Sequence, residues 1–277
     1  MRRIVITELM DERAVAQLVA KHDVLYDPKP VDDAPRLKAQ AANADAIIVR
    51  NRTQVRGELL AALARCTVVG RLGVGLDHID VACEARGIKV IPATGANALS
   101  VAEYVVAGAR LLLRGAYRAT PEGIAGQWPR NALSNGREIG GKTLGLVGFG
   151  SIGQLTARLA RGMRMTLIAF DSMLDASNPV FAQTGVRCVG LDTLTANADV
   201  ISLHVPLVDE AAVAQALRSG HLGGAALDEF DAEPVPAGSV FAGCPNLLLT
   251  PRIAGVSAES NERVSFLIAT MVLEAVG

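Results

Sequence analysis

Aromatic residues are scarce in this chain, making up 4% of its 277 residues, with Trp128 as its one tryptophan. An excess of either charge is also lacking, because 27 Lys and Arg residues oppose 28 Asp and Glu residues with the signs interspersed. There is no basic stripe along the chain. Nucleic acid and anionic membrane surfaces are therefore excluded as expected partners.

Long apolar runs are missing too. Arg110 and Arg114 interrupt the most apolar helical stretch, and Glu274 interrupts the last one, so we expect no membrane-spanning segment. The first residues turn acidic before an apolar core long enough for a signal peptide can form. These absences predict a cytoplasmic protein.

Cysteines are few and histidines do not cluster with them. The cysteines lack C-x-x-C or metal-binding spacing, which predicts free thiols in a reducing cytosol and no metal site. They are Cys66, Cys83, Cys188 and Cys244.

The chain is rich in apolar residues, at 50% of the total, and its length suits two domains. In residues 1–95 short apolar strands alternate with helical patterns, which predicts a parallel sheet covered by helices. We therefore expect an α/β protein with two doubly wound parallel-sheet domains. The first comprises residues 1–96 and 256–277, and the second residues 97–255.

Residues 142–171 carry the most informative motif: an apolar strand, the loop GFGSIG, a helix, and a second apolar strand. Gly148 permits a tight turn, Gly150 lets the backbone approach a pyrophosphate, and Gly153 lets helix and strand pack closely. The loop is completed by Ser151 and Ile152, and the helix N-terminus offers free N–H groups to phosphate.

Asp171 ends the second strand of this motif. Its carboxylate can accept hydrogen bonds from the adenosine ribose hydroxyls and would repel a 2′-phosphate, so NAD is favoured over NADP. The alternative is a glycine-rich turn in another kind of α/β protein. The strand before the loop, the helix after it and the acid at a spacing of about 20 residues favour the dinucleotide site over that alternative.

A second glycine-rich loop, RLGVGLDHID at residues 71–80, follows a predicted strand. Its exposed backbone N–H groups would lie at the carboxyl end of a parallel sheet and suit a small carboxylate. Val74 and Gly75, with Arg52 of the polar loop RNRTQ, are the candidate substrate-binding residues. An ordinary glycine turn before a helix is an equally consistent interpretation.

Residues 97–114 predict a long helix with Ser100 and Glu103 at capping-box spacing. Its apolar surface exceeds one core face, which favours packing against a second subunit. The polar segment that follows, to Arg137, suits either an arm that covers a partner or a plain surface loop.

Seven stretches together resemble the D-isomer-specific 2-hydroxyacid dehydrogenase family, over nearly the whole chain and most closely its sulfolactate dehydrogenase branch. They are VRNRTQV, GRLGVGLDHID, TGANALSVAEYV, GGKTLGLVGFGSIG, HVPL, ALRSGHLGGAALDEFDAEP and NLLLTPRIAG. The resemblance implies a flavodoxin-like substrate domain, a Rossmann domain for NAD and a homodimer. It also implies hydride transfer between nicotinamide and C2 of a small 2-oxo acid.

The resemblance also implies site residues. His204 and Pro206 of HVPL and Asp228 match cofactor-binding positions, Asp228 matching the aspartate that approaches the nicotinamide carboxamide. Glu233 matches the catalytic glutamate, although a solvated acid in an acidic loop is the alternative. Arg252 occupies the position of the family's histidine. Arginine cannot act as a general acid because it keeps its proton, but Arg252 could itself bind the substrate carboxylate.

The family's catalytic arginine lies in a segment that is absent here, since Leu207 and Val208 run directly into Asp209. We therefore expect the cofactor domain to be one strand short, with strand 199–205 directly beside strand 224–228. We also expect an ion pair between Arg252 and Glu233. Two hypotheses result: a 2-hydroxyacid dehydrogenase of impaired activity, or an inactive NAD-binding or structural subunit.

Overall fold

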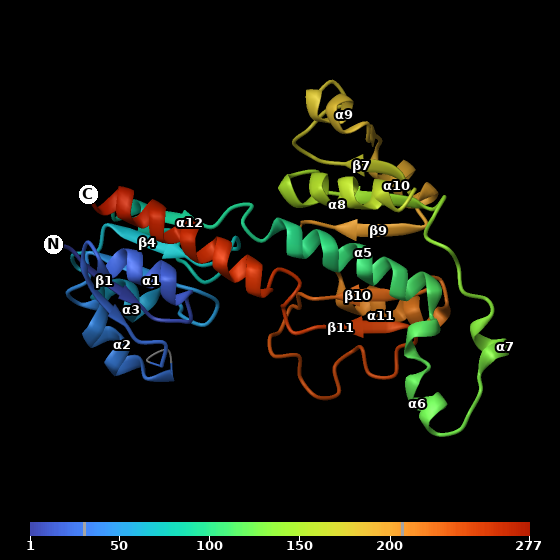
Figure 1. Cartoon of the computed structure of the whole chain (residues 1–277), viewed down its shortest axis with the longest axis horizontal. Helices are drawn as coiled ribbons and strands as arrows, with labels where there is room; N and C mark the ends of the chain where they lie inside the picture. The colour runs from blue at the N-terminus through green and yellow to red at the C-terminus, as the bar shows by residue number, and fades with distance from the viewer. Residues whose placement is uncertain (30–31, 206–207) are drawn as a thin grey trace. The chain divides into compact units, whose positions relative to one another are not determined.

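The computed structural model describes residues 1–29, 32–205 and 208–277. They form two compact units, drawn in Figure 1. Unit 1 is Met1–Asn97 with Val256–Gly277, and unit 2 is Ala98–Gly255, so the first boundary falls one residue later than the sequence pattern indicated.

Unit 1 is built on a five-stranded parallel sheet in the order β2-β1-β3-β4-β5. This is the flavodoxin-like order, as predicted. The central strand β3 is buried at all of its residues, as its uniformly apolar sequence requires. The strands are β1 (Arg3–Ile6), β2 (Asp23–Tyr26), β3 (Ala46–Val49), β4 (Val68–Arg71) and β5 (Lys89–Pro92).

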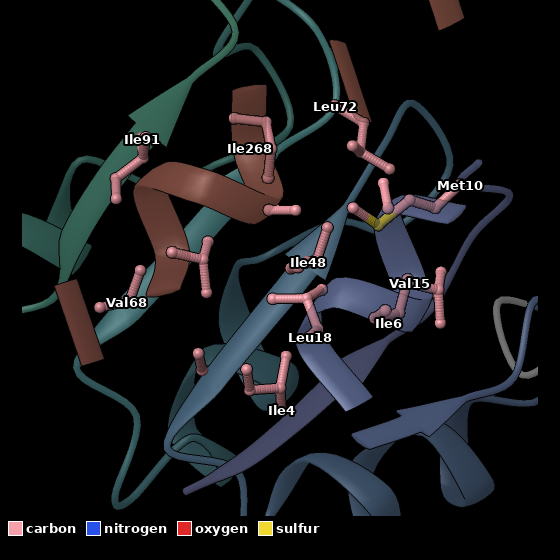
Figure 2. Close-up of a cluster of buried hydrophobic side chains, with 14 of the residues drawn as sticks. Ile4, Ile6, Met10, Val15, Leu18, Ile48, Val68, Leu72, Ile91 and Ile268 are labelled. Carbon is pink, nitrogen blue, oxygen red and sulfur yellow. The ribbon is translucent and has the colours of Figure 1, made fainter. Parts of the chain in front are cut away.

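Helices cover both faces of this sheet. On one face, α1 and α12 pack over a cluster that includes Ile4, Ile48 and Ile268 (Figure 2). The other face carries a second cluster, to which α2, α3 and α4 contribute. The helices are α1 (Glu12–Val19), α2 (Ala34–Ala41), α3 (Gly57–Ala62), α4 (Ala82–Ala85) and α12 (Ala258–Val276).

Unit 2 contains a four-stranded parallel sheet in the order β8-β7-β6-β9 and a separate parallel pair, β10-β11. The four-stranded order corresponds to the first four strands of a Rossmann fold. The strands are β6 (Thr143–Val147), β7 (Thr166–Phe170), β8 (Arg187–Cys188), β9 (Val200–Leu203), β10 (Ala225–Leu227) and β11 (Leu247–Leu249).

Helices also lie on both faces of the four-stranded sheet. Phe149 and Phe181, whose rings stack at 5.2 Å, anchor the cluster beneath α8 and α9, and Leu194 of α10 packs on the opposite face. The helices are α5 (Ala98–Arg114), the 3₁₀ turn η2 (Ala116–Arg118), α6 (Thr120–Ile124), α7 (Arg130–Leu133), α8 (Ser151–Gly162), α9 (Pro179–Thr184), α10 (Leu191–Asn197) and α11 (Glu210–Ser219). Because α5 begins at Ala98, Ser100 lies inside it, and the predicted cap at Ser100 is wrong.

The predicted pairing of β9 with β10 is wrong. Within the described residues β9 pairs with β6 only, and β10 pairs with β11. The physical reason is helix α5, which packs against both α8 and β10. Gly108 of α5 faces Ala226 of β10, where an added Cβ would lie 3.6 Å from the Ala226 Cβ. A move of β10 to β9 would give up this packing.

Among the residues described, none of the helices combines the length and apolar content needed to cross a membrane.

Candidate active site

The loop GFGSIG joins β6 to α8, and its three glycines differ in what surrounds them. Gly148 has φ +91°, and an added Cβ would lie 3.1 Å from Val205 Cγ1. A Cβ on Gly153 would lie 2.4 Å from the carbonyl oxygen of Gly148, so only glycine lets the helix approach the turn so closely. At Gly150 nothing lies within 4 Å of an added Cβ, which leaves an open approach to the backbone.

The first turn of α8 follows this open position. Gly150 is its N-cap and provides no side-chain cap, so the backbone N–H groups of the first turn remain available to an anion. Ser151 is exposed and Ile152 half-buried there. This local geometry fits a pyrophosphate in the manner that the sequence predicts.

Asp171 follows β7 and already has two backbone partners. Its Oδ2 accepts a hydrogen bond from the N–H of Phe149 at 2.7 Å, and its Oδ1 accepts one from the N–H of Met173 at 2.8 Å. The side chain therefore ties the glycine loop to the end of β7. That position suits a carboxylate for the ribose hydroxyls, and it adds a structural role that the sequence did not indicate.

His204 lies at the end of β9 against the glycine loop. An added Cβ on Gly148 would lie 3.3 Å from the His204 Cβ, and the His204 Nε2 is 3.2 Å from Ser202 Oγ. Burial lowers the pKa of His204 to about 4, so the imidazole is neutral at neutral pH. Pro206, the neighbouring residue predicted to bind cofactor, lies outside the described residues.

Arg252 is held between two carboxylates. Its Nη1 donates to Glu233 Oε1 and its Nη2 to Glu229 Oε1, each at 3.1 Å. The predicted contact with Glu233 is confirmed, whereas Glu229 is a partner that sequence reasoning missed. The backbone of Arg252 has φ 55°, in the left-handed region that non-glycine residues rarely adopt.

Asp228 holds the loop that carries Arg252. Its Oδ2 accepts from the N–H of Ala254 at 2.7 Å, and its Oδ1 accepts from the N–H of Ile253 at 2.8 Å and from Thr250 Oγ1 at 2.7 Å. The Thr250 hydroxyl is in turn 2.6 Å from the Tyr104 hydroxyl of α5. Asp228 therefore fixes residues 250–254, a role that the resemblance did not imply.

The candidate substrate residues of unit 1 lie in two loops at the carboxyl edge of its sheet. The side chain of Arg52 pairs with Asp32 and is largely exposed. Val74 and Gly75 are exposed, and in the described part of the chain their backbone N–H groups donate to no protein acceptor. These groups are therefore available to a small carboxylate.

Sequence reasoning missed two buried charged residues beneath these loops, Glu8 and Arg71. Glu8 accepts hydrogen bonds from the backbone of residues 50–53, and Arg71 contacts Asn51 and Gly75. The signal for each was a charged residue at the end of a buried strand, where a charge needs partners.

Across the ranges 1–29, 32–205 and 208–277, no three His, Cys, Asp or Glu side chains are grouped so as to hold a metal ion.

The Rossmann-type strand order, the glycine loop and Asp171 in unit 2 define a dinucleotide-dependent oxidoreductase class. The family model described as "D-isomer specific 2-hydroxyacid dehydrogenase, catalytic domain" matches residues 4–277. The chain belongs to this family. NAD is its cofactor. The assignment of Gly148, Gly150, Gly153 and Asp171 to its binding stays a prediction, with which the geometry of the glycine loop is compatible.

Three relatives illustrate the similarity. An (S)-sulfolactate dehydrogenase of Chromohalobacter salexigens is 46% identical over 100% of this chain and 99% of the relative. A hydroxypyruvate reductase of Thermotoga maritima is 31% identical over 99% of this chain and 98% of its own length. A D-3-phosphoglycerate dehydrogenase of Mycobacterium bovis is 34% identical over 97% of this chain, which spans 56% of that protein.

The alignment with the Chromohalobacter protein is 308 positions long, whereas this chain has 277 residues. That relative therefore has residues without a counterpart here, as expected for an internal deletion. Among solved structures, one from Thermus thermophilus has a TM-score of 0.84 at 25% identity and covers 99% of this chain and 96% of its own. One from Pyrococcus horikoshii has a TM-score of 0.81 at 26% identity, covering 99% and 92%.

Proposed function

We propose that this protein binds NAD(H) and a small 2-oxo or 2-hydroxy acid but transfers hydride between them with impaired efficiency. The observation that carries the proposal is the position of Arg252, whose guanidinium is paired with both Glu229 and Glu233. NAD supplies or accepts the hydride when bound. The protein must supply the proton at the substrate oxygen and stabilise the charge that develops there.

Arg252 is unsuited to the proton step. A guanidinium keeps its proton at any working pH, so it cannot protonate an alkoxide. Glu233, which would otherwise orient an acid and raise its pKa, is occupied by a permanent cation at 3.1 Å. Loss of a general acid typically lowers a rate by ~10²–10⁴-fold. The two carboxylates also neutralise Arg252, which weakens it as a ligand for the substrate carboxylate.

The 2-oxo acid substrate would be held by unit 1, through the backbone N–H groups of Val74 and Gly75 and the side chain of Arg52. A 2-oxo acid with a second anionic group is the favoured substrate class, because the relative at 46% identity is named as a sulfolactate dehydrogenase. Sulfopyruvate is therefore the first compound to test.

The second candidate function is an inactive NAD-binding or structural subunit. It is favoured by the pairing of β9, which in the described residues has β6 as its one strand partner. The absent segment would have carried the family's arginine as well as a strand. Without that arginine, substrate binding and stabilisation of charge in the transition state are both reduced.

The test has two stages. NADH binding is measured by fluorescence, and NADH oxidation is then followed with sulfopyruvate, oxaloacetate, glyoxylate and hydroxypyruvate. We expect binding with turnover well below ordinary enzyme rates of ~1–10³ s⁻¹. Turnover at ordinary rates with any of these acids would contradict the proposed impairment. Failure to bind NADH would exclude both the impaired dehydrogenase and an NAD-binding subunit.

A pair of variants sharpens the test. Arg252→His should restore little activity, because a restored acid still lacks the substrate-holding arginine and such residues do not act additively. Arg158→His, at an exposed position of α8, is the matched control for introducing a histidine. A rate increase above ~10²-fold in Arg252→His alone would show that the acid was the single missing part.

We also propose a cytoplasmic homodimer. The segment after α5 carries Tyr117, Ile124 and Trp128, which are 56%, 84% and 86% exposed and suit contact with a second copy. The four thiols are all free, which suits a reducing compartment. Sedimentation of the protein and of Trp128→Ser tests the dimer; a monomer in both would contradict it.

A further inference from the structure

Four backbone N–H groups converge on one buried carboxylate in unit 1. Glu8 follows β1 and is 6% exposed. Its Oε1 accepts from the N–H groups of Arg50 at 2.8 Å and Thr53 at 2.9 Å. Its Oε2 accepts from those of Asn51 at 3.1 Å and Arg52 at 3.0 Å. Each oxygen thus receives two donors from the loop that follows β3.

These contacts keep Glu8 charged. Burial raises the pKa of the Glu8 carboxyl, but the hydrogen bonds from Thr53, Arg52 and Arg50 outweigh it and hold the pKa below its usual value. A carboxylate is the one side chain that can accept from all four donors, because each of its oxygens has two lone pairs and neither carries a proton.

The side chains of the same loop are fixed as well. Arg50 Nη1 donates to Asn261 Oδ1 of α12 at 2.6 Å and to the carbonyl oxygen of Leu9 at 3.2 Å. The hydroxyls of Thr7 and Thr53 lie 2.8 Å apart, both buried. Through Arg50 and Thr53 the loop is therefore anchored to the segment that follows β1 and to α12.

The network continues to the glycine loop after β4 through a buried arginine. Arg71 is 4% exposed, and its Nη2 donates to Asn51 Oδ1 at 3.0 Å. Its Nε donates to the carbonyl oxygen of Gly75, also at 3.0 Å. A Cβ on Gly73 would lie 2.5 Å from Arg71 Nη1, so the guanidinium lies directly against the backbone of this loop.

We propose that Glu8 is a positioning residue that holds both loops of unit 1 in the form that receives the 2-oxo acid. It acts directly on residues 50–53, and through Asn51 and Arg71 on the loop that contains Val74 and Gly75. The inference rests on the proposed function, since the acid is the ligand that these loops receive. It assigns Glu8 and Arg71, both buried beneath these loops, to the support of the binding site.

The test uses Glu8→Gln in the full-length protein. Glutamine replaces one oxygen by an NH₂ group, which faces two N–H donors and can accept from neither. Amide hydrogen exchange of residues 50–53 should accelerate by roughly tenfold or more, because hydrogen bonds to a charged acceptor are lost. The affinity for sulfopyruvate, measured by calorimetry with NADH present, should fall by a similar factor, and the affinity for NADH should not change.

Asp45→Asn is the matched control. Asp45 is another buried carboxylate of unit 1, also 6% exposed, which accepts from the N–H of Arg3 at 2.8 Å and from Arg65 Nη2 at 3.1 Å. It lies at the amino edge of the same sheet, before β3. This variant should leave sulfopyruvate affinity unchanged, even if it lowers the stability of the unit.

Asn51→Ala tests the contact with Arg71 separately from the contact with Glu8. It removes the side chain that accepts from Arg71 and keeps the backbone N–H that donates to Glu8. Sulfopyruvate affinity should fall while residues 50–53 remain protected. The inference is overturned if Glu8→Gln and Asn51→Ala bind sulfopyruvate like the unmodified protein, or if Asp45→Asn loses the same affinity. Absence of sulfopyruvate binding in the unmodified protein is a different failure: it rejects the proposed substrate, whereas slow exchange at 50–53 would still identify the anchor.

Discussion

Alanine substitutions at Gly150 and Gly153 should have different effects, the first on NADH affinity and the second on the stability of unit 2. An alanine at Gly150 meets nothing within 4 Å, so Gly150→Ala should leave the stability of unit 2 unchanged. Its methyl group would occupy the space through which a pyrophosphate approaches the backbone, so the Kd for NADH should rise at least roughly tenfold. Gly153→Ala should instead lower stability, because its Cβ would lie 2.4 Å from the Gly148 carbonyl oxygen.

The expected cost of Gly153→Ala is that of overpacking against backbone, about 1–3 kcal/mol. In a unit of this size each kcal/mol shifts Tm by about 2–4 °C, so a decrease of roughly 2–12 °C is expected. Calorimetry gives Tm and NADH fluorescence titration gives Kd. Gly162→Ala, near the end of α8 with open space around its Cβ, is the control for both. If Gly150→Ala unfolds unit 2, or binds NADH normally, the assignment of this loop is wrong.

Three further outcomes are expected. Asp171→Ala should weaken NADH binding and reduce the difference in affinity between NADH and NADPH, because it removes both the partner of the ribose hydroxyls and the acceptor for the Phe149 N–H. Equal affinity of the unmodified protein for the two cofactors would contradict this prediction. Folding lowers the pKa of His204 from 6.5 to about 4. The free energy of unfolding should therefore decrease by up to about 3 kcal/mol as the pH falls from 6.5 to about 4. His204→Gln should flatten the dependence of the urea midpoint on pH between about 7 and 5, above the range in which carboxylates titrate. Leu203→Lys, at a residue 42% exposed on β9, should reduce aggregation in light-scattering assays while changing stability by less than about 1 kcal/mol.

The parts of the fold that were predictable are those with local causes. Buried parallel strands such as β3 are uniformly apolar, and helix starts such as that of α11 follow a capping acid, Asp209, whose Oδ1 accepts from the N–H of Ala212 at 2.9 Å. The close approach at Gly153 has a local cause too, since its neighbour is the carbonyl oxygen of Gly148, whereas Gly148 itself meets His204 and Val205 from a distant part of the chain. The contact of Arg252 with Glu233 followed from family motifs and opposite charge.

The parts that could not be predicted depend on partners distant in sequence. Glu8 accepts hydrogen bonds from residues more than 40 positions away, and only a folded sheet brings β1 beside β3. An acid just after an apolar strand, Glu8, was the available signal in the sequence, and it did not indicate which residues would contact it. In the same way, nothing local to Arg252 indicated that Glu229 would share its guanidinium.

The pairing of β10 shows how strand pairing and helix packing can favour different arrangements after a deletion. Closing the sheet would have given β9 a second partner and covered Ile201 and Leu203, each 42% exposed. It would also have required β10 to leave α5 and to carry β11 with it, since the two strands pair in register from Ala225–Leu247 to Leu227–Leu249. The structure keeps the contacts between α5 and β10, and in the part of the chain that it describes β9 has no strand partner besides β6. Retaining them also keeps Thr250 within 2.6 Å of Tyr104 on α5, and with it the Asp228 bonds that set the loop of Arg252. The pairing of β10 with β11 instead of β9 and the geometry of the candidate site are therefore both explained by the packing of β10 on α5.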